Sequence, residues 1–474
     1  MYPKQAHYQA VLRPDQIIIP KPHFDTRRGR LGDLPEAASF LSVRLLQIGG
    51  VWLGLGLAAW AAEVPKTLFL SWEGDPRTTM TAQWMRGPGL GEHPAAGQPE
   101  TIQWRKAGAN DWSTLVTKTN AFPDPKLWRK RQIQESQLQS KKAVFPHPTK
   151  VKESVWTLVK ASWEGLEPGQ EYEFKTGNSP TWKFRTAPAQ LEPGLTFAAG
   201  GDSDVTAEAE AIFGAAAGQD PLFIHVGGDL AYSDGHDVAQ EMAFWKMYHR
   251  AAQTKEGRLI PFVAGIGNHD VQGGYWKPGK TFEEMKEKAP FYYALFGGLY
   301  RRDEPVALDF GDYLSLLMLD TEHVTPMDRQ TEWLEKSLES RKGVPWVFAS
   351  WHIAAYPSAR GWNSQPMSGY ARENWIPLIE KSQAAGVFNH HDHDLQRVET
   401  EGKGGRKIMV FGNGAIGIDL RRPRCEESAR LAKFRAMAHH IYVVSLTDEK
   451  AVVTAVGIGG KELDRAEIQA SSLR

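Results

Sequence analysis

The stretch that decides the fold is Gly227-Gly228-Asp229-Leu230-Ala231-Tyr232-Ser233-Asp234-Gly235. It follows the largely apolar run Leu222–Val226, which is typical of a buried parallel strand. Asp229 therefore lies where a strand ends and a glycine-rich loop begins, the edge at which open α/β sheets bind ligands. Tyr232 adds a phenolic oxygen three residues later. A lone aspartate in this position is more often a helix cap or turn residue, so the assignment depends on the other loops.

Four further stretches have the same form, a strand-like run followed by side chains that bind metals. They end in Asp202 and Asp204, in Asn268-His269-Asp270, in His352, and in Asn389-His390-His391-Asp392-His393. A dinuclear metal site uses such a set, because two cations about 3.5–4 Å apart clamp the attacking and leaving oxygens of an in-line displacement. One carboxylate must bridge the cations, and Asp229 is the central candidate. Core histidines and turn aspartates are the alternative explanation of these loops.

Composition and charge narrow the functional classes. Lys and Arg together number 56, as do Asp and Glu, so no net charge favours nucleic acid or an anionic membrane surface as a partner. The single cysteine, Cys425, excludes an intrachain disulfide and a cysteine-rich metal site. Any metal ligands must therefore come from His, Asp, Asn and Tyr, which are hard or borderline donors.

Residues 1–63 are interpreted as a polar extension followed by a signal peptide. Leu45–Ala62 is free of charge, follows Arg44 and ends in the small-residue pattern Ala59-Trp60-Ala61-Ala62. We therefore expect export to the periplasm, the cell envelope or the medium, with no membrane contact after cleavage. An uncleaved membrane anchor is the alternative, because the run is just long enough to span a bilayer.

Residues 64–188 are predicted to form a β-sandwich. Short alternating runs, for example Met80–Trp84, Val155–Val159 and Glu171–Lys175, are separated by turns rich in Gly and Pro. The charged stretch Lys126–Lys142 departs from this pattern and indicates a solvated insertion.

Residues 193–474 are predicted to form an α/β domain with mixed sheets flanked by helices. Apolar runs alternate with helical stretches at Ala207–Ala217, Gln240–Ala252 and Gln330–Arg341. Ile441–Leu446 and Ala451–Val456 are expected to close the domain as a pair of strands.

The five loops, in this order, resemble the calcineurin-like metallophosphoesterases and, within them, the purple acid phosphatases. The pattern of that family is GD, then GDxxY, GNHE/D, a His after a strand, and GHxH. The resemblance extends from residue 65 to about residue 470. Gly74-Asp75-Pro76 and Phe184-Arg185-Thr186-Ala187-Pro188 are similar to the fibronectin-like N-terminal domain of the plant-type enzymes.

The resemblance implies a ligand set and two metal ions. One ion would take Asp202, Asp229, Tyr232 and His393, and the other would take Asp229, Asn268, His352 and His391. In the family the tyrosinate binds Fe(III), and the partner ion is iron, zinc or manganese. His269 would protonate the leaving oxygen, Asp270 would orient its imidazole, and hydroxide bound to the metals would be the nucleophile.

Departures from the family pattern affect the substrate cleft. His390 stands where the family has glycine, and we expect it to narrow the loop or to touch substrate. Asp204 also replaces a glycine and is a candidate extra ligand that competes with Tyr232. Ala359–Tyr370 lacks the substrate-binding histidines of the plant enzymes, so Arg360, Trp362 and Asn363 are expected to line that part of the cleft. Arg360 and Tyr356, which fits the family pattern, are the expected substrate contacts.

The leading hypothesis is an exported, metal-dependent phosphoesterase of the acid phosphatase type that hydrolyses small phosphomonoesters. Two alternatives stay open: a phosphodiesterase that acts on nucleotides or lipid head groups at the same site, and a cell-envelope binding protein with a structural metal site. The physiological substrate, the second metal and the oligomeric state are not determined by the sequence.

Overall fold

The computed structural model describes residues 64–90, 100–125, 155–297, 304–402 and 405–470, which all belong to one compact unit. The expected leader Leu45–Ala62 and the expected insertion Lys126–Lys142 lie outside these described residues. Within the described ranges, no helix is both long enough and apolar enough to cross a membrane.

The N-terminal strands form two antiparallel sheets of four strands each. The first has the order β1 (Phe69–Ser71), β2 (Met80–Arg86), β6 (Thr157–Trp163), β5 (Lys118–Ala121). The second has the order β4 (Ser113–Val116), β3 (Thr101–Lys106), β7 (Glu171–Thr176), β8 (Trp182–Arg185). The strand expected at Val155–Val159 begins two residues later, at Thr157, and extends to Trp163.

Aromatic side chains join these two sheets. Side chains on β7 alternate between partly exposed and buried, so Tyr172 and Phe174 point to the same inner face. Trp163 of the first sheet lies with its ring centroid 5.5 Å from that of Phe174 and 5.1 Å from that of Phe184. The alternation seen in the sequence therefore produces the packed interior between the sheets.

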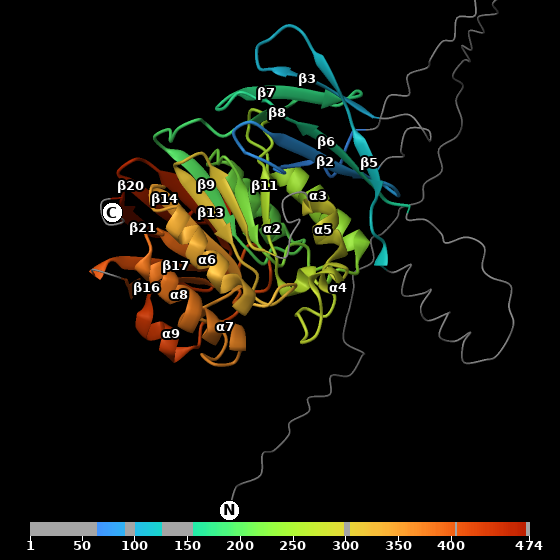
Figure 1. Cartoon of the computed structure of the whole chain (residues 1–474). Coiled ribbons are helices and arrows are strands. Elements are labelled where there is room, and N and C mark those ends of the chain that lie inside the picture. The colour runs from blue at the N-terminus through green and yellow to red at the C-terminus, as the bar shows by residue number, and fades with distance from the viewer. Residues whose placement is uncertain (1–63, 91–99, 126–154, 298–303, 403–404, 471–474) are drawn as a thin grey trace, which may run out of the picture. The chain divides into compact units, whose positions relative to one another are not determined.

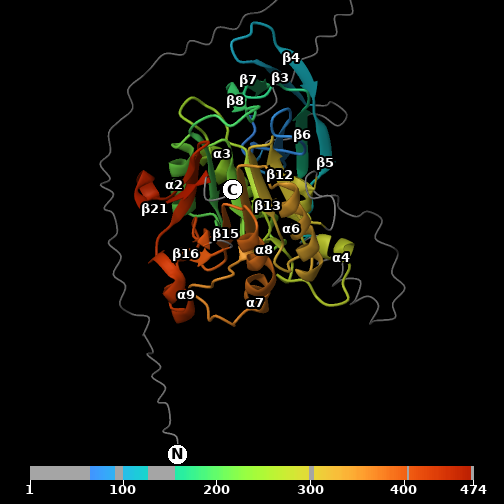
Figure 2. The ribbon, with the colours of Figure 1, turned by 60° about the vertical axis from the view of Figure 1, so that its left-hand side comes forward.

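The rest of the chain forms two mixed sheets (Figures 1 and 2). The first has the order β11 (Phe262–Gly265), β10 (Ile224–Gly227), β9 (Leu195–Gly200), β19 (His440–Leu446), β20 (Lys450–Gly457), β21 (Glu462–Gln469). The second has the order β12 (Val306–Phe310), β13 (Leu314–Met318), β14 (Trp346–Ile353), β15 (Gly386–His390), β17 (Lys407–Asn413), β16 (Leu395–Glu401), β18 (Ala432–Ala436). Strands β9, β10 and β11 are parallel, as are β13, β14, β15 and β17. The predicted closing pair of strands is β19 and β20, which pair antiparallel.

The two mixed sheets face each other, and β14 shows why its sequence is apolar throughout. Alternate residues of a strand point to opposite faces. Phe348 points toward the first sheet, where its ring lies 5.6 Å from that of Phe197 on β9. Trp351 points the other way, and its ring lies 5.3 Å from that of Trp375 in the helical layer. Both faces of β14 are therefore buried, and His352 lies on the face between the sheets.

Helices cover the outer faces of the two sheets. α2 (Ala207–Ala217) and α3 (Val238–Ala251) pack together on the first sheet, and α6 (Asp328–Ser340) and α8 (Ile376–Lys381) lie side by side over the second (Figure 1). α2 has the predicted bounds because the Thr206 hydroxyl caps it by accepting the Ala209 N–H at 3.1 Å. The shorter helices are α4 (Phe282–Lys286), α5 (Pro290–Phe296), α7 (Pro366–Tyr370), α9 (Glu426–Leu431), and the turns η1 (Asn268–Asp270), η2 (Ala371–Trp375) and η4 (Ile458–Gly460).

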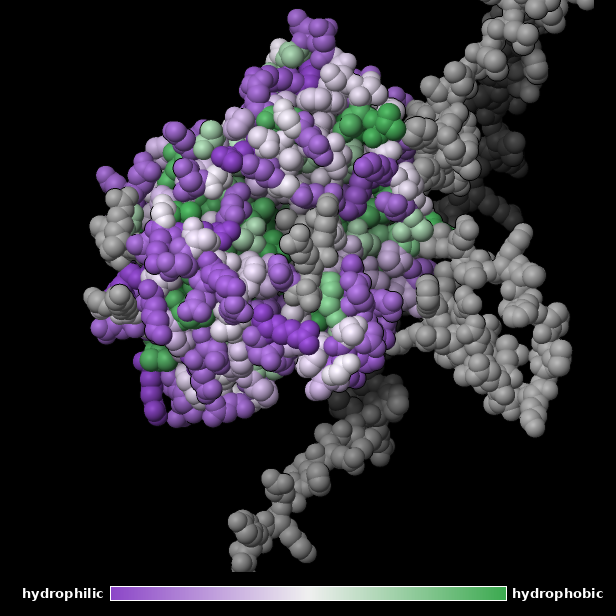
Figure 3. Space-filling model, in the orientation of Figure 1, coloured by the Kyte–Doolittle hydropathy of each residue, from purple (hydrophilic) through white to green (hydrophobic). Residues whose placement is uncertain are grey.

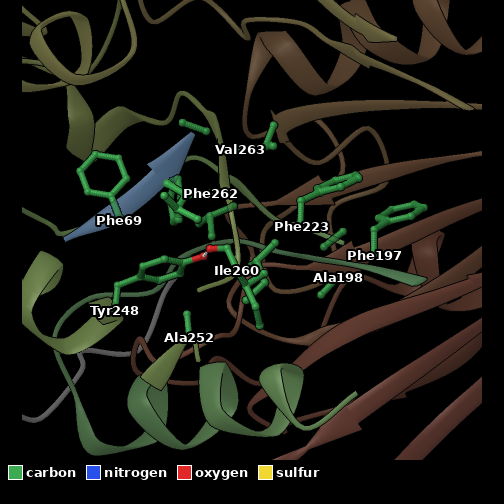
Figure 4. Packing of buried hydrophobic residues seen from close by; sticks show 14 of the residues in the cluster. Phe69, Phe197, Ala198, Phe223, Tyr248, Ala252, Ile260, Phe262 and Val263 are labelled. Carbon is green, nitrogen blue, oxygen red and sulfur yellow. Dashed lines mark hydrogen bonds between the residues drawn. The ribbon is translucent and has the colours of Figure 1, made fainter. Parts of the chain in front are cut away.

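One aromatic core continues from the N-terminal sheets into the α/β region. Phe69 on β1 stacks on Trp245 of α3 with ring centroids 3.9 Å apart. Figure 4 shows Phe69, Phe262 of β11 and Tyr248 as members of this core; the Tyr248 ring lies 4.9 Å from that of Phe262, and its hydroxyl donates to the Ile260 carbonyl at 3.0 Å. On the outside, the face drawn in Figure 3 is mostly hydrophilic.

Candidate metal centre

Strands from both mixed sheets end at the same edge. On β9, β10 and β11 the last residues pair in register, Val226 with Gly200 and Gly227 with Gly265. The loops that follow these strands carry Asp202, Asp229 and Asn268. The second sheet adds His352 near the end of β14 and His391 and His393 just after β15. The five loops predicted from the sequence therefore meet at one place.

The side chains at this edge fall into two neighbouring groups. One ligand atom from each of Asp202, Asp229, His352 and His391 lies within 4.8 Å of the others, and all four residues are buried. On one side of this cluster the Tyr232 hydroxyl lies 3.2 Å from Asp202 Oδ1 and 3.3 Å from His393 Nε2. Asp202 is thus shared by both groups, with Asp229 beside it.

Buried oxygen atoms without hydrogen bonds show that a cation fits this cluster. In the described part of the chain, neither Asp229 Oδ2 nor Asn268 Oδ1 has a hydrogen-bond partner. The nearest imidazole nitrogen, His352 Nε2, lies 3.3 Å from Asp229 Oδ2. Because an unpaired buried carboxylate oxygen is costly, a positive ion is the natural partner for these atoms.

Hydrogen bonds on the far side of two imidazoles set their tautomers for metal binding. His352 Nδ1 lies 3.1 Å from the Gly227 carbonyl, and His393 Nδ1 lies 3.1 Å from the Asp419 carbonyl. A carbonyl oxygen only accepts, so each Nδ1 carries a proton, and Nε2 is the nitrogen that each imidazole would offer to a cation.

The pKa values in the cluster also indicate a strongly negative environment. Burial raises the pKa of Tyr232 well above 10, and the charges of Asp202 and Asp229 raise it further. Burial would lower the pKa of His352, but the same two carboxylates outweigh burial and raise it to about 9. The two carboxylates contribute to both shifts, and a bound cation would neutralise their charge.

Most of the residues in and beside the cluster have a left-handed backbone conformation. Asp202, Asp229, Tyr232, His391 and His393 have φ angles of 55°, 54°, 54°, 71° and 52°. This region is unfavourable for residues other than glycine, and such residues concentrate at functional sites where the surrounding structure enforces them. Gly267 supports one of these turns, since a Cβ there would lie 2.3 Å from Asp229 Oδ1.

Comparisons with known proteins agree with this geometry. Residues 200–395 match the family described as calcineurin-like phosphoesterase. These residues form a calcineurin-like phosphoesterase domain. The matched segment contains all seven of the side chains from which the cluster and its Tyr232 flank are built.

Solved structures with the same fold support this assignment. A purple acid phosphatase, PPD1 from yellow lupin (Lupinus luteus) seeds, is 15% identical with a TM-score of 0.64, over 86% of this chain and 75% of that chain. The structure of PhoD is 14% identical with a TM-score of 0.54, over 86% of this chain and 89% of that chain. At these identities the likeness concerns the fold. A comparison with curated protein sequences finds no significant match.

Asp270 is expected from the sequence to orient His269, and this prediction is wrong, because Asp234 makes that contact. The Asp270 carboxylate is buried and accepts the backbone N–H groups of Asp229, Leu230 and Gly267 at 2.9, 3.0 and 2.8 Å. Asp270 therefore anchors the loop of Asp229 instead of orienting His269. The Nδ1 atom of His269 lies 2.6 Å from Asp234 Oδ1. No spacing rule in the sequence distinguishes these two aspartates.

The imidazole of His269 also stacks on the Tyr232 ring, with centroids 4.3 Å apart and planes inclined by 29°. It is 36% exposed, which leaves its free edge accessible from solvent. Asp234 and Tyr232 together fix this ring beside the metal cluster.

Asp204, the candidate extra ligand, points away from the cluster. Its Oδ1 atom accepts the Val205 N–H at 2.7 Å and the Gln240 side-chain amide at 2.9 Å. Asp204 therefore joins its own loop to α3.

His390 lies beneath the metal cluster, so its expected contact with substrate is wrong. Phe388 and His390 are two apart on β15 and point to the same face, toward the first sheet. The His390 ring is buried, and its Nε2 lies 3.2 Å from the Ser350 hydroxyl, which in turn lies 2.8 Å from His225 Nε2. His390 therefore belongs to a buried polar chain between the sheets.

The two other expected substrate contacts lie on the loop after β14. Arg360 Nη1 donates to the His391 carbonyl and to Asp392 Oδ1, both at 2.6 Å, so it supports the loop of two ligand positions. Tyr356 is buried, with its ring centroid 5.9 Å from that of Trp362. Their contact with substrate stays a prediction.

The sequence analysis missed Glu241, a buried carboxyl group behind the Tyr232 loop. Its Oε2 accepts the Ser233 hydroxyl at 2.9 Å, and its Oε1 accepts the Trp245 indole N–H at 2.8 Å. Burial raises the pKa of Glu241 to about 7. The helical position of Glu241 within an apolar face of α3 is the signal that could have revealed it.

We predict that Gly227→Ala disrupts the fold and that His390→Gly rescues it. A Cβ at Gly227 would lie 1.8 Å from His390 Nε2, an overlap that neither buried group can relieve by a small shift. The single Gly227→Ala variant should lose most of its soluble yield or unfold at a much lower temperature. The double variant, which restores the glycine of the family pattern, should recover the thermal midpoint of His390→Gly alone. An equally unstable double variant would contradict the placement of His390.

We also predict that Glu241 makes stability depend on pH. Because its folded pKa of about 7 lies above its ordinary value of 4.5, the folded protein binds more protons between these values. Stability should therefore fall as pH rises through this window. Glu241→Gln keeps an acceptor for Trp245, presents an amide N–H that can donate to the Ser233 hydroxyl oxygen, and does not titrate. Between pH 5 and pH 7.5, the thermal midpoint of the metal-free protein should fall by more in wild type than in Glu241→Gln. The exposed Glu208→Gln serves as control, and parallel midpoints in wild type and Glu241→Gln would refute the prediction.

Proposed function

We propose that the chain is an exported phosphatase of the purple acid type that hydrolyses small phosphate monoesters with two metal ions. The observation that carries this proposal is the pair of unpaired buried oxygens, Asp229 Oδ2 and Asn268 Oδ1, at the point where all five loops meet. The calcineurin-like phosphoesterase domain supports phosphoester hydrolysis. The substrate, the export and the identities of the metals are parts of the proposal.

The proposed ligands divide as the family resemblance implies, with Asp229 rather than Asp202 as the shared carboxylate. Asp202, Tyr232 and His393 would hold one ion, and Asn268, His352 and His391 would hold the other, with Asp229 between them. When bound, the two cations would act as Lewis acids that polarise a phosphoryl oxygen and lower the pKa of a water molecule. We propose Fe(III) beside Tyr232, because a highly charged cation would offset the burial and the carboxylate charges that raise the pKa of this phenol. Iron, zinc or manganese would occupy the other position.

His269, held by Asp234, is the proposed proton donor to the leaving oxygen. The Asp234 carboxylate holds His269 with Nδ1 protonated, which turns Nε2 toward the accessible side of the ring. A protonated His269 would donate from Nε2 to the leaving oxygen, and the stack on Tyr232 keeps the ring from rotating.

The arrangement of the N-terminal strands supports a fibronectin-like domain. In chain order, the sheets β1-β2-β6-β5 and β4-β3-β7-β8 have the pattern ABED and C′CFG of immunoglobulin-like sandwiches. We propose that this domain is the fibronectin-like module that accompanies the plant-type enzymes, and that it serves as a structural support for α3 through Phe69.

Metal analysis with turnover tests the proposed function. We expect purified full-length protein to hold two metal ions, to show a broad visible band that disappears in Tyr232→Phe, and to hydrolyse p-nitrophenyl phosphate. Asp229→Asn should bind at most one ion and lose about 1000-fold in kcat, because Lewis-acid stabilisation contributes several kcal/mol. Asp204→Asn, which changes the neighbouring loop outside the cluster, should keep both ions.

The other outcomes separate the alternatives. Faster turnover of bis(p-nitrophenyl) phosphate than of the monoester would establish a phosphodiesterase instead. Two ions without any turnover of either ester would favour the binding protein. A protein that binds no metal after reconstitution would refute the dinuclear assignment.

A second prediction concerns the proton donor. Asp234→Asn should reduce kcat about tenfold and His269→Ala about 100-fold or more for an alkyl phosphate, whose poor leaving group needs a proton. Both variants should lose much less on p-nitrophenyl phosphate, because p-nitrophenolate leaves without protonation. Asp270→Asn should instead lower the thermal midpoint and show no dependence on the leaving group. Equal losses on both esters in Asp234→Asn would contradict the assigned pair.

A further inference from the structure

A side-chain amide touches one of the proposed ligands from the side away from the cluster. Gln365 lies on the loop after β14, immediately before α7, and its Nε2 atom is 2.8 Å from His391 Nε2. The other ring nitrogen, His391 Nδ1, faces the cluster at 3.2 Å from His352 Nε2. Gln365 is half-buried, and nothing in the family pattern or the sequence analysis pointed to it.

The two nitrogens of His391 have linked roles. A neutral imidazole carries one proton, so one nitrogen donates while the other accepts. In the structure the amide N–H of Gln365 donates to Nε2, which leaves the single proton of a neutral His391 on Nδ1. That tautomer points a proton, and no lone pair, at the position of a metal ion.

Metal binding requires the opposite tautomer. If Nδ1 is a ligand, Nε2 carries the proton and needs an acceptor. Rotation of the Gln365 amide by half a turn exchanges its oxygen and nitrogen without moving other atoms. The amide oxygen then accepts from Nε2–H at the same distance, and Nδ1 presents its lone pair to the cluster.

We propose that Gln365 is a positioning residue that fixes the metal-binding tautomer of His391. A neutral amide suits this task because it offers a donor to the metal-free tautomer and an acceptor to the metal-bound one. Among the described residues, Gln365 makes the one hydrogen bond to His391 Nε2, while Arg360 bonds the carbonyl of the same residue. This inference rests on the proposed function, because it takes His391 as a ligand.

Zinc affinity of the metal-stripped, full-length protein tests the proposal. Loss of the hydrogen-bond partner of a ligating histidine typically weakens metal binding about 10–100-fold. Gln365→Leu keeps the size of the side chain but neither donates nor accepts, so the weaker of its two Zn²⁺ dissociation constants should rise by that factor. Gln365→Glu accepts from Nε2–H and should bind Zn²⁺ at least as tightly as wild type. Competition with a chelator measures both constants.

Asn363→Leu is the matched control. It lies two residues earlier on the same loop, is exposed, and its Oδ1 accepts from Arg372 at 3.2 Å rather than from a proposed ligand. It should bind Zn²⁺ as wild type does. Circular dichroism and thermal midpoints of the metal-free proteins show whether each variant is folded.

Nitrogen NMR of histidine-labelled protein gives a second readout. In the zinc-loaded wild type and in Gln365→Glu, His391 should be protonated at Nε2, and this result supports the proposal even where Gln365→Leu fails to fold. Protonation at Nδ1 in the loaded protein, or wild-type zinc affinity in folded Gln365→Leu, overturns it. If wild type itself binds no Zn²⁺, the proposed function fails before the role of Gln365 is reached.

Discussion

Two buried carboxylates, Asp202 and Asp229, set the electrostatic constraint on which the rest of the site depends. In the described part of the chain, their ion-pair partners are the imidazoles of His352 and His393, and both contacts exceed 3.2 Å. No buried anion is stable without compensation, and the surrounding groups respond to this charge. Burial raises the pKa of Tyr232 and the two carboxylates raise it further, and the same carboxylates raise the pKa of His352 against the effect of burial. Two bound cations would neutralise the charge of these carboxylates more completely than the imidazoles that contact them.

The loops hold this charge because side-chain carboxylates accept hydrogen bonds from backbone N–H groups. The Asp270 carboxylate gathers three N–H groups from two loops, and Asp202 Oδ2 accepts the His391 N–H at 2.7 Å. Glycines allow these approaches, as the 2.3 Å gap between a Cβ at Gly267 and Asp229 Oδ1 shows. The left-handed conformations of the ligand residues are therefore held in place by contacts from several strands, which is how strain persists at a functional site.

Two features distinguish this chain from the family pattern that it resembles. His390 occupies space that the family leaves to a glycine, and it extends a polar chain through Ser350 to His225 between the sheets. Gln365 lies in the loop where the plant enzymes carry substrate-binding histidines, and its side-chain amide contacts His391. His390 lies below the cluster, and Gln365 contacts the proposed ligand His391 from the other side.

The sequence by itself predicted the alternation of strands and helices and the five loops that meet at the metal cluster. Apolar runs that end in Gly-Asp or Asn-His patterns specify where parallel strands stop, and Thr206 specifies where α2 begins, because both signals are local. It could not determine which aspartate contacts His269, where His390 points, or that Gln365 meets His391. These depend on left-handed turns and on contacts between segments brought together only by folding, such as Asp234 with His269 and Ser350 with His225. The alternation of β15 places His390 on the same face as Phe388, but only the tertiary structure shows that this face points toward the first sheet.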